Sequence, residues 1–336
     1  MKAAVLVKLN QPLEIWDLEL SPLDVGQVLV RVLLSGICGA QLQEIQGHKG
    51  NEKFLPHLMG HEGYGVVVDV GNGVTKVKKG DKVVMHWRPG TGIESGFPSY
   101  RYSHKTLSGG KITTLSEMSI VSENRLTAVP DDTNPELGAL LGCSLSTALA
   151  LIENESELKF GESVLIIGCG GVGLNLIAAA RLRGAGEIVG LDVQRSKREL
   201  VIQQGANLFY SDPKEVERKF DLVIDTSGDV EVIDWAFHKL GRLGRLVLVG
   251  QPTPGNSLRL SSALEFFNGR GLKILASQGG SFSPQTDIPR YLNLFDIGHL
   301  MVNNLVTHRL DLSRVNEAFE ILRSGRAGRV ILSMNT

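Results

Sequence analysis

The stretch SVLIIGCGGVGLNLIAAARLRGAGEIVGLD, residues 163–192, decides the fold of this chain. A short run of Val, Leu and Ile ends at Gly168, a glycine-rich turn follows, and the next residues carry apolar side chains at helical spacing. A second apolar run, EIVGLD, ends at Asp192. This order predicts a strand, a tight turn, a helix and a second strand, which together form one β-α-β unit of a parallel sheet.

The glycines of the turn have the spacing of a dinucleotide-binding loop. Gly168, Gly170 and Gly173 form a GxGxxG pattern, in which the glycines allow a tight turn, close approach of the pyrophosphate and close packing of helix on strand. The helix that follows presents free backbone N–H groups to phosphate oxygens. The pattern therefore predicts a dinucleotide site at Gly168, Gly170, Gly171 and Gly173.

Asp192 indicates which dinucleotide binds. It ends the second strand, 19 positions after Gly173, where a carboxylate accepts hydrogen bonds from the ribose hydroxyls and repels a 2′-phosphate. The sequence therefore favours NAD over NADP, although Arg195, Lys197 and Arg198 lie nearby and soften the exclusion of NADP.

The alternation of strand and helix continues beyond Asp192. Further apolar runs lie at residues 208–210, 221–227, 245–250 and 272–277, and helical patterns separate most of them, for example at 196–205, 213–219 and 230–240. Six strands of this kind predict a doubly wound parallel sheet with helices on both faces.

The first 125 residues follow a different pattern. Val- and Gly-rich strands such as 27–34, 63–70 and 81–87 are broken by turn residues, which predicts a β-rich, barrel-like domain. Near the C-terminus a helical pattern at 313–325 and a strand at 329–334 are expected to rejoin it. Residues 87–111 carry so many turn formers that we expect a long loop there.

The composition excludes several functional classes. Lys plus Arg number 35 and Asp plus Glu 36, and the basic residues are scattered, which argues against a nucleic-acid partner. The sequence carries neither an apolar run of membrane-spanning length nor a secretory signal, so we expect a cytoplasmic protein that does not bind membranes. The three cysteines are too few for a disulfide framework.

Two of these cysteines raise the possibility of a metal site. Cys38, His61 and Cys143 supply two thiols and an imidazole, a ligand set that catalytic zinc accepts with its fourth position open, and Glu62 adjoins His61. The spacings of 23 and 82 residues form no local zinc motif, so buried structural roles for the same residues stay open at this point.

Six segments of the chain, in content and order, resemble the zinc-containing alcohol dehydrogenases of the medium-chain dehydrogenase/reductase superfamily. They are GHEGYGVVVDVG (60–71), GDKVV (80–84), LLGCSLSTAL (140–149), IGCGGVGLN (167–175), GLDVQRSK (190–197) and LRSGRAGRVIL (322–332). The resemblance implies a GroES-like catalytic domain over 1–145, a Rossmann NAD-binding domain over 146–277, and a return to the catalytic domain over 278–336. The active site is then expected in the cleft between the two domains.

The resemblance also implies roles for individual residues. It makes Cys38, His61 and Cys143 the ligands of one catalytic zinc, with Glu62 able to approach the metal. Trp87 takes the position of an aromatic wall of the substrate pocket. The expected cofactor contacts, besides the glycine turn and Asp192, are Thr147 and Val172 at the nicotinamide, Val249 at its carboxamide, Lys197 at the ribose and Arg329 at the pyrophosphate.

The implied reaction is hydride transfer between an alcohol and NAD(H), with the substrate oxygen bound at the open position of zinc. Cys169 matches no ligand and is expected to pack within the glycine turn. The family's second, structural zinc needs four closely spaced cysteines, and residues 87–111 contain none, so we expect no structural zinc.

The chain departs from the family pattern after Cys38. Where the family commonly has a hydroxyl residue, an acid and a histidine, this chain has Ala40, Gln41 and Gln43, so the usual hydroxyl relay for the proton is missing. The Gln41 carbonyl is a candidate acceptor for the His61 ring. We therefore hypothesise that the proton leaves by water, with Glu62, His48 or His86 assisting, and we count Gln43 with Glu62 and Trp87 as candidate catalytic residues.

The polar residues near these positions, which are His86, Arg88, Gln41, Gln43 and Glu44, favour a polyol or a sugar-derived alcohol over a plain aliphatic one. Two alternatives stay open: a metal-free NAD(P)H-dependent enone or quinone reductase of the same superfamily, and a non-catalytic dinucleotide-binding protein. Members of the family form dimers and tetramers, so we expect a homodimer or homotetramer.

Overall fold

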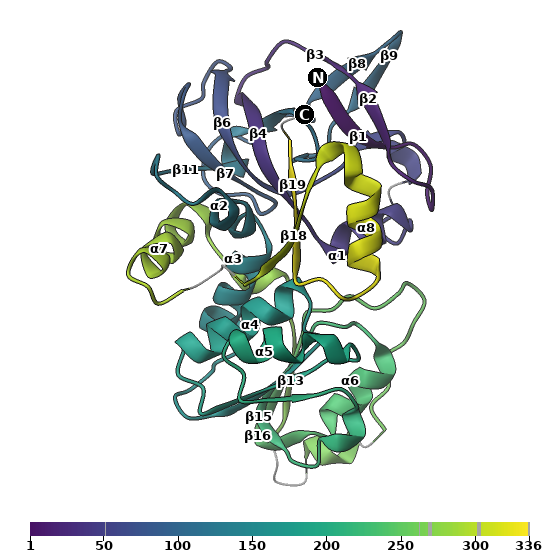
Figure 1. The fold of residues 1–336 in the computed structure, drawn as a ribbon, viewed down its shortest axis with the longest axis vertical. Helices are drawn as coiled ribbons and strands as arrows, with labels where there is room; N and C mark the ends of the chain where they lie inside the picture. The colour runs from purple at the N-terminus through teal and green to yellow at the C-terminus, as the bar shows by residue number, and fades with distance from the viewer. Residues whose placement is uncertain (51, 262, 268–270, 301–303, 335–336) are drawn as a thin grey trace. The chain divides into compact units, whose positions relative to one another are not determined.

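The structure is a computed structural model, and it describes residues 1–50, 52–261, 263–267, 271–300 and 304–334. The backbone separates into two compact units (Figure 1). The first unit holds Met1–Ser144, Ser283–Ile297 and Val306–Thr336, and the second holds Leu145–Phe282 and Gly298–Leu305.

The first unit is the β-rich domain that the sequence predicts. Within the described residues its main sheet has seven strands in the order β11-β7-β6-β4-β19-β18, with β10 also paired to β4. The alternation along β4 explains this sheet, because Val28, Val30 and Val32 all point into one buried cluster with Val330 and Leu332 of β19. The C-terminal strand is therefore part of the first domain's core, as expected from the sequence.

The elements of the first unit have these bounds: β1 Lys2–Leu6, β2 Glu14–Asp17, β3 Glu19–Leu20, β4 Gln27–Ile37, α1 Gly39–Ile45, β5 His57–Leu58, β6 Glu62–Val70, β7 Lys82–His86, β8 Ser99–Tyr102, β9 Lys105–Ser108, β10 Met118–Ser122, β11 Leu126–Val129, α2 Pro135–Leu141, α7 Pro284–Asp296, β18 Val306–Asp311, α8 Val315–Arg323 and β19 Arg329–Ser333.

The prediction of a continuous loop over residues 87–111 is wrong in its second half. Strands β8 and β9 form an antiparallel hairpin there, and β8 also pairs with β3. Tyr100 and Leu107, which face each other across the hairpin, are buried among the apolar residues of β1 and its neighbours. The alternating pattern of SYRY and KTLS contains this signal, but the glycines, serines and prolines around it conceal the two short strands.

The second unit is a parallel sheet of the Rossmann kind. Within the described residues the six strands lie in the order β14-β13-β12-β15-β16-β17, and every neighbouring pair is parallel. Residues Val164–Ile167 of the central strand β12 are consecutively buried, as expected for a strand covered on both faces. The chain reverses its direction of progress across the sheet between β12 and β15, and open sheets of this type bind ligands at such a point.

The elements of the second unit are α3 Ser144–Ala150, whose first residue belongs to the first unit, a π-helix Leu151–Glu155, β12 Ser163–Ile167, α4 Gly171–Leu182, β13 Glu187–Leu191, α5 Arg198–Gln203, β14 Leu208–Tyr210, β15 Phe220–Asp225, α6 Val230–Phe237, β16 Leu240–Leu248 and β17 Lys273–Ala276. The helical pattern at 213–219 gives only a 3-10 turn at Pro213–Glu215, because Val216 is already extended.

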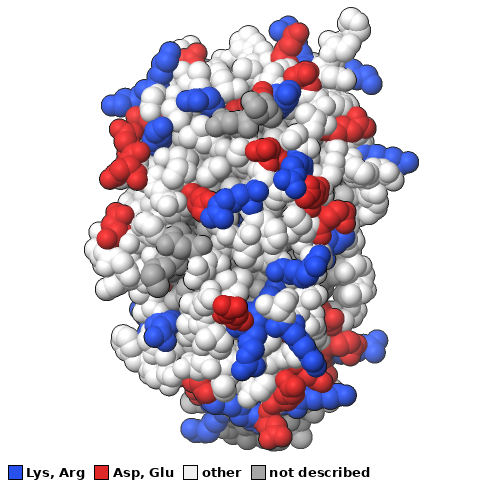
Figure 2. All heavy atoms as spheres, viewed as in Figure 1, with Lys and Arg blue, Asp and Glu red and all other residues white. Residues whose placement is uncertain are grey.

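Charged side chains of both signs are interspersed on the face shown in Figure 2. Among the described residues, no single helix is both long and apolar enough to cross a membrane; one bent pair of consecutive helices passes by length and composition alone.

Candidate functional site

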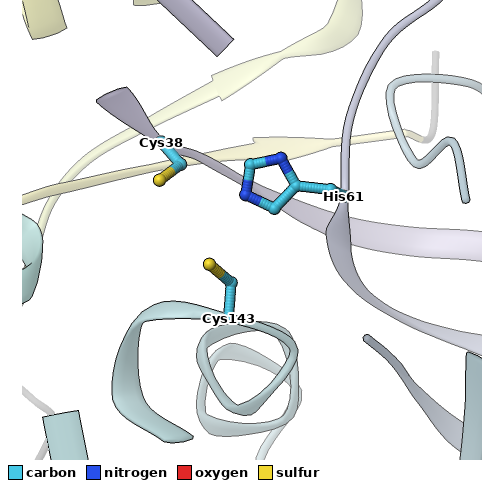
Figure 3. A group of neighbouring side chains, drawn as sticks. All are labelled: Cys38, His61 and Cys143. Atoms are coloured by element: carbon cyan, nitrogen blue, oxygen red, sulfur yellow. The ribbon is translucent and has the colours of Figure 1, made fainter. Parts of the chain in front are cut away.

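Three side chains of the first unit converge on one point. Cys38 lies between β4 and α1, His61 directly precedes β6, and Cys143 follows α2. The two sulfur atoms and the imidazole nitrogen all lie within 4.8 Å of one another. Figure 3 shows the two thiols and the ring pointing toward this common centre. The structure thus brings together the three predicted ligands, which are far apart in the sequence.

The donor set fits zinc. Zinc bonds of about 2.0–2.3 Å place tetrahedral ligand atoms about 3.3–3.8 Å apart, so the observed cluster needs only small movements to enclose the ion. Two thiolates and one imidazole are ligands that zinc accepts, and three protein ligands leave one position for a substrate oxygen. Among the described residues, this is the one group of three or more His, Cys, Asp or Glu side chains so arranged.

The thiol of Cys38 is prepared for metal binding. A hydrogen bond with Cys143 holds the pKa of Cys38 well below its ordinary value; burial opposes this shift, while a hydrogen bond and the charge of His61 add to it. Thiolates rather than thiols bind metals, so the same environment that lowers this pKa favours the ligand form.

Glu62 and Arg329 lie beside the cluster and form an ion pair with each other. Glu62 is fully buried and Arg329 is 2% exposed. The other carboxylate oxygen of Glu62 accepts the backbone N–H of Ser144 at 3.2 Å. The charge of Arg329 also lowers the pKa of Cys38. Glu62 is therefore held near the predicted ligands by Arg329, the residue expected at the pyrophosphate.

Gln41, the expected acceptor for the His61 ring, and His86, one of the residues expected to assist the proton, have other partners. The Gln41 carbonyl accepts the Cys38 backbone N–H at 2.8 Å, which fixes the first turn of α1. Both ring nitrogens of His86 are engaged, Nδ1 with the Arg88 carbonyl at 2.7 Å and Nε2 with Thr127 Oγ1 at 3.0 Å. Burial lowers the pKa of His86 to about 4, so its ring is neutral at pH 7 and does not accept a proton there.

A cavity of about 350 Å³ opens beside the predicted zinc ligands, within the first unit. His61 and Trp87 line it, so the predicted aromatic wall and a predicted ligand share one space. Its remaining lining residues come from α1, from the segment before His61, from the region of the β8–β9 hairpin and from the turn between β10 and β11. They include Glu44, Phe54, His57, Leu58, Phe97, Ser108, Lys111, Ile112 and Arg125. Gln43 is absent from the described lining residues, although its neighbour Glu44 is present.

The glycine turn of the second unit has the geometry that a dinucleotide needs. Gly168 has φ +80, a conformation that favours glycine. A Cβ on Gly170, the N-cap of α4, would meet no atom within 4 Å, which leaves space for a phosphate group. A Cβ on Gly173 would lie 1.9 Å from the Gly168 carbonyl oxygen, so only glycine allows this approach of helix to turn.

Asp192 and Lys197 are placed beside this turn. The Asp192 carboxylate accepts the backbone N–H of Cys169 and that of Gln194, both at 2.8 Å, and Lys197 Nζ at 3.1 Å. Asp192 therefore anchors the turn itself, and Lys197 is directed at its carboxylate. Cys169 is fully buried and burial raises the pKa of its thiol, in line with its expected packing role.

The other predicted cofactor contacts belong to separate elements. Thr147 is buried in α3 and Val172 lies in the first turn of α4. Val249 follows β16, and its N–H is already donated to the Asp225 carbonyl at 2.8 Å, which leaves only its carbonyl for a ligand.

Sequence reasoning missed several residues of the cavity. Phe54, His57 and Arg125 line it beside His61, and Phe97 and Lys111 belong to the segment expected as a loop. His57 lies four positions before His61, and this short spacing was the signal available in the sequence. The other residues meet only through tertiary pairing, which one sequence does not reveal.

Comparison with known proteins agrees with this arrangement. Residues 24–131 match the family model of the alcohol dehydrogenase GroES-like domain, and residues 171–296 match that of the zinc-binding dehydrogenases. The chain is 30% identical to the NDMA-dependent alcohol dehydrogenase of Amycolatopsis methanolica, over 98% of each chain. It is also 30% identical to the putative alcohol dehydrogenase D of Mycobacterium tuberculosis, again over 98% of each chain.

Among solved structures, an alcohol dehydrogenase zinc-binding domain protein from Burkholderia ambifaria superposes with a TM-score of 0.89 at 25% identity, covering 100% of this chain and 99% of that one. The chain belongs to the zinc-containing alcohol dehydrogenases of the medium-chain dehydrogenase/reductase superfamily. It is accordingly a zinc-dependent, NAD(P)-dependent oxidoreductase of small alcohols and carbonyls, with its metal site at Cys38, His61 and Cys143.

Proposed function

We propose that this enzyme transfers hydride between NAD and a polar alcohol, a polyol or a sugar-derived alcohol, at a single zinc ion. The observation that carries the proposal is the cavity beside His61, which both aromatic and charged side chains line. Phe54, Trp87 and Phe97 offer flat apolar surfaces, while Glu44 and Lys111 offer groups that bind hydroxyls.

Zinc, when bound, supplies Lewis acidity toward the substrate oxygen, and NAD takes up or gives the hydride. The chain's own residues orient the substrate. Trp87 and Leu58 exclude water from the carbon skeleton, and Arg125 donates to the Trp87 carbonyl and so supports this wall. Lys111 and Arg125 are both paired with Glu94, which keeps two cations in place around the cavity.

The preference for NAD rests on Asp192. Its side chain is 8% exposed beside the glycine turn, and a 2′-phosphate there would meet a buried carboxylate. We expect Asp192→Gly to weaken NAD binding and improve the use of NADP, helped by Arg195 and Arg198. The measurement is kcat/KM for both cofactors in the wild type and the variant; equal use of both by the wild type would contradict the assignment.

Two further points complete the proposal. We expect about one zinc per chain, since the sequence has three cysteines and none lies between residues 87 and 111. We also propose a homodimer or homotetramer, which Phe267 and Leu264 support by exposing 77% and 67% of their surface on the second unit. Light scattering of the zinc-loaded protein measures the assembly directly.

The substrate test is a panel of alcohols matched in size: a pentitol, an aldose-derived alcohol, benzyl alcohol and a straight-chain alcohol. The proposal predicts that kcat/KM for the polyols exceeds that for benzyl alcohol by about tenfold or more, the value of one additional hydrogen bond. A preference for benzyl alcohol would show that the aromatic rings alone set the specificity. Oxidation of NADPH by enones without bound zinc would instead support the metal-free reductase.

A further inference from the structure

An acid–histidine pair lies in the cavity beside the predicted zinc ligands. Neither residue is one of the predicted zinc ligands or NAD contacts. Glu44 is on α1 and His57 is on β5, and both line the same cavity as His61. His57 Nε2 lies 3.7 Å from Glu44 Oε1, and their side chains are 9% and 28% exposed. The pair is thus largely shielded from bulk water and yet open to the cavity.

The neutral tautomer of His57 follows from its contact with the Leu58 carbonyl. Its Nδ1 lies 2.8 Å from the Leu58 carbonyl oxygen, and because a carbonyl only accepts, Nδ1 carries the hydrogen. In the neutral ring the lone pair is therefore on Nε2, the nitrogen that faces Glu44. A proton taken up at Nε2 would be stabilised by the carboxylate, as in other carboxylate–histidine pairs.

Several charged groups surround the pair. Burial raises the pKa of Glu44, and His57, His61 and Lys49 act in the opposite direction. Lys111 and Arg125 also line the cavity, but both are paired with Glu94. Glu44 is the one acid among the described residues that line the cavity, and its carboxylate lies 3.7 Å from His57 Nε2.

Oxidation of an alcohol releases a proton that needs an acceptor. Ala40 has no hydroxyl, Glu62 is committed to Arg329, and His86 has both ring nitrogens engaged and is neutral at pH 7. Of the groups considered for this role from the sequence, only His48 is left without such a commitment, and it is not among the described residues that line the cavity. Glu44 and His57, by contrast, both line the cavity.

We propose that His57, oriented by Glu44, is the proton acceptor of the alcohol dehydrogenase reaction, acting through water in the cavity. The alcohol O–H and C–H bonds break, the hydride goes to NAD, the carbonyl forms, and the proton forms an N–H bond at His57 Nε2 before it passes to solvent. In the reverse direction the same atom supplies the proton. This inference rests on the proposed function and adds a catalytic residue, His57, and a positioning residue, Glu44.

The test uses the zinc-loaded enzyme with the best alcohol found in the panel. His57→Gln is expected to lower kcat/KM about 100-fold at pH 7, the lower end of general-base contributions, and added imidazole should restore part of the loss. Glu44→Gln should lower kcat/KM by less. It should also move the acid limb of the pH profile to lower pH, because the carboxylate no longer stabilises a proton on the histidine ring. His104→Gln, on the exposed turn between β8 and β9, is the matched control.

Zinc per chain, NADH binding by fluorescence and thermal unfolding are measured on every variant, and they should match the wild type. The proposal is overturned if both variants keep the wild-type kcat/KM and pH profile, or if the loss in His57→Gln is indifferent to imidazole and Glu44→Gln leaves the profile in place. A wild type that binds no zinc and oxidises no alcohol would refute the proposed function itself, and the proton role with it.

Discussion

Glu62 and Arg329 form a buried ion pair next to the predicted zinc ligands, and this makes each side chain dependent on the other. Desolvation lowers the pKa of Arg329, and the charge of Cys38 raises it again. Taking two charges out of water is unfavourable, so a buried pair is not strongly stabilising, but removing one partner leaves the other charge without compensation.

We therefore expect Arg329→Met to lower the free energy of unfolding by about 3–5 kcal/mol. The double variant Glu62→Gln, Arg329→Met should recover most of this loss, because no unpaired charge is left. Urea unfolding of the wild type, both single variants and the double variant gives the coupling energy. Additive effects in this cycle would show that the two side chains do not depend on each other.

His86 makes the stability of the first unit depend on pH. Burial holds its pKa at about 4, below the value of about 6.5 in the unfolded chain. The unfolded chain thus binds the proton more tightly, so the stability from neutral His86 is present above about pH 6.5 and is lost as the pH falls toward 4. The full effect is about 3 kcal/mol.

The check is the free energy of unfolding between pH 7 and pH 4 for the wild type and His86→Gln, both free of zinc, so that metal loss does not contribute. The difference between the two proteins should shrink as the pH falls. His104→Gln should follow the wild type throughout. A difference that stays constant over this range would show that folding does not lower the pKa of His86.

At the scale of elements, Glu123 connects three segments of the first unit. It lies in the turn between β10 and β11 and is 1% exposed. Its carboxylate accepts the backbone N–H groups of Thr75, Lys76 at 2.6 Å, and Ile93 at 2.8 Å. These hydrogen bonds outweigh burial and lower the pKa of Glu123. One side chain thus holds the start of the 87–111 segment, part of which surrounds the cavity.

Glu123→Gln should lower the free energy of unfolding by about 2–3 kcal/mol, because an amide has one acceptor oxygen and its NH₂ would face a backbone donor. Proteolysis of the 87–98 segment should accelerate as well. Glu19→Gln, which removes an exposed ion pair with Arg101, is the matched control and should change stability by less than about 1 kcal/mol. Equal effects of the two substitutions would contradict the role of Glu123.

Elements could be predicted from the sequence where their own apolar periodicity determines them. The strands of the Rossmann unit and the long strands β4, β6 and β7 have uniform apolar periodicity, and the structure has them where the pattern indicates. The β8–β9 hairpin was missed because its burial depends on pairing with β3, a two-residue strand about 80 positions earlier. The helical pattern at 213–219 failed because only Val216 of that segment is well buried.

In the candidate site, too, the sequence indicates the ligands but not their hydrogen-bond and ion-pair partners. Cys38, His61 and Cys143 were found through their residue types and a family resemblance, and the structure brings them together. The partners of these residues were not readable: that Arg329 pairs with Glu62, or that His86 bonds to Thr127, depends on how strands distant in the chain align. The pair of Glu44 and His57 was missed for this reason.

At the scale of the whole molecule, the two units have different tasks. The first unit contributes the zinc ligands and the cavity, and the second contributes the glycine turn and Asp192. Hydride transfer requires both, since the metal activates the alcohol and the nicotinamide takes the hydride. Turnover should therefore be lost when either unit's site is disabled, even though the other still binds its ligand.

The most direct test of the central claim is zinc content measured by elemental analysis, together with alcohol-dependent NAD reduction, in the same preparation. We predict about one zinc per chain in the wild type. Cys38→Ser and Cys143→Ser should lose both zinc and turnover, and should still bind NADH. Full alcohol oxidation in a zinc-free protein, or wild-type zinc and activity in both cysteine variants, would contradict the account.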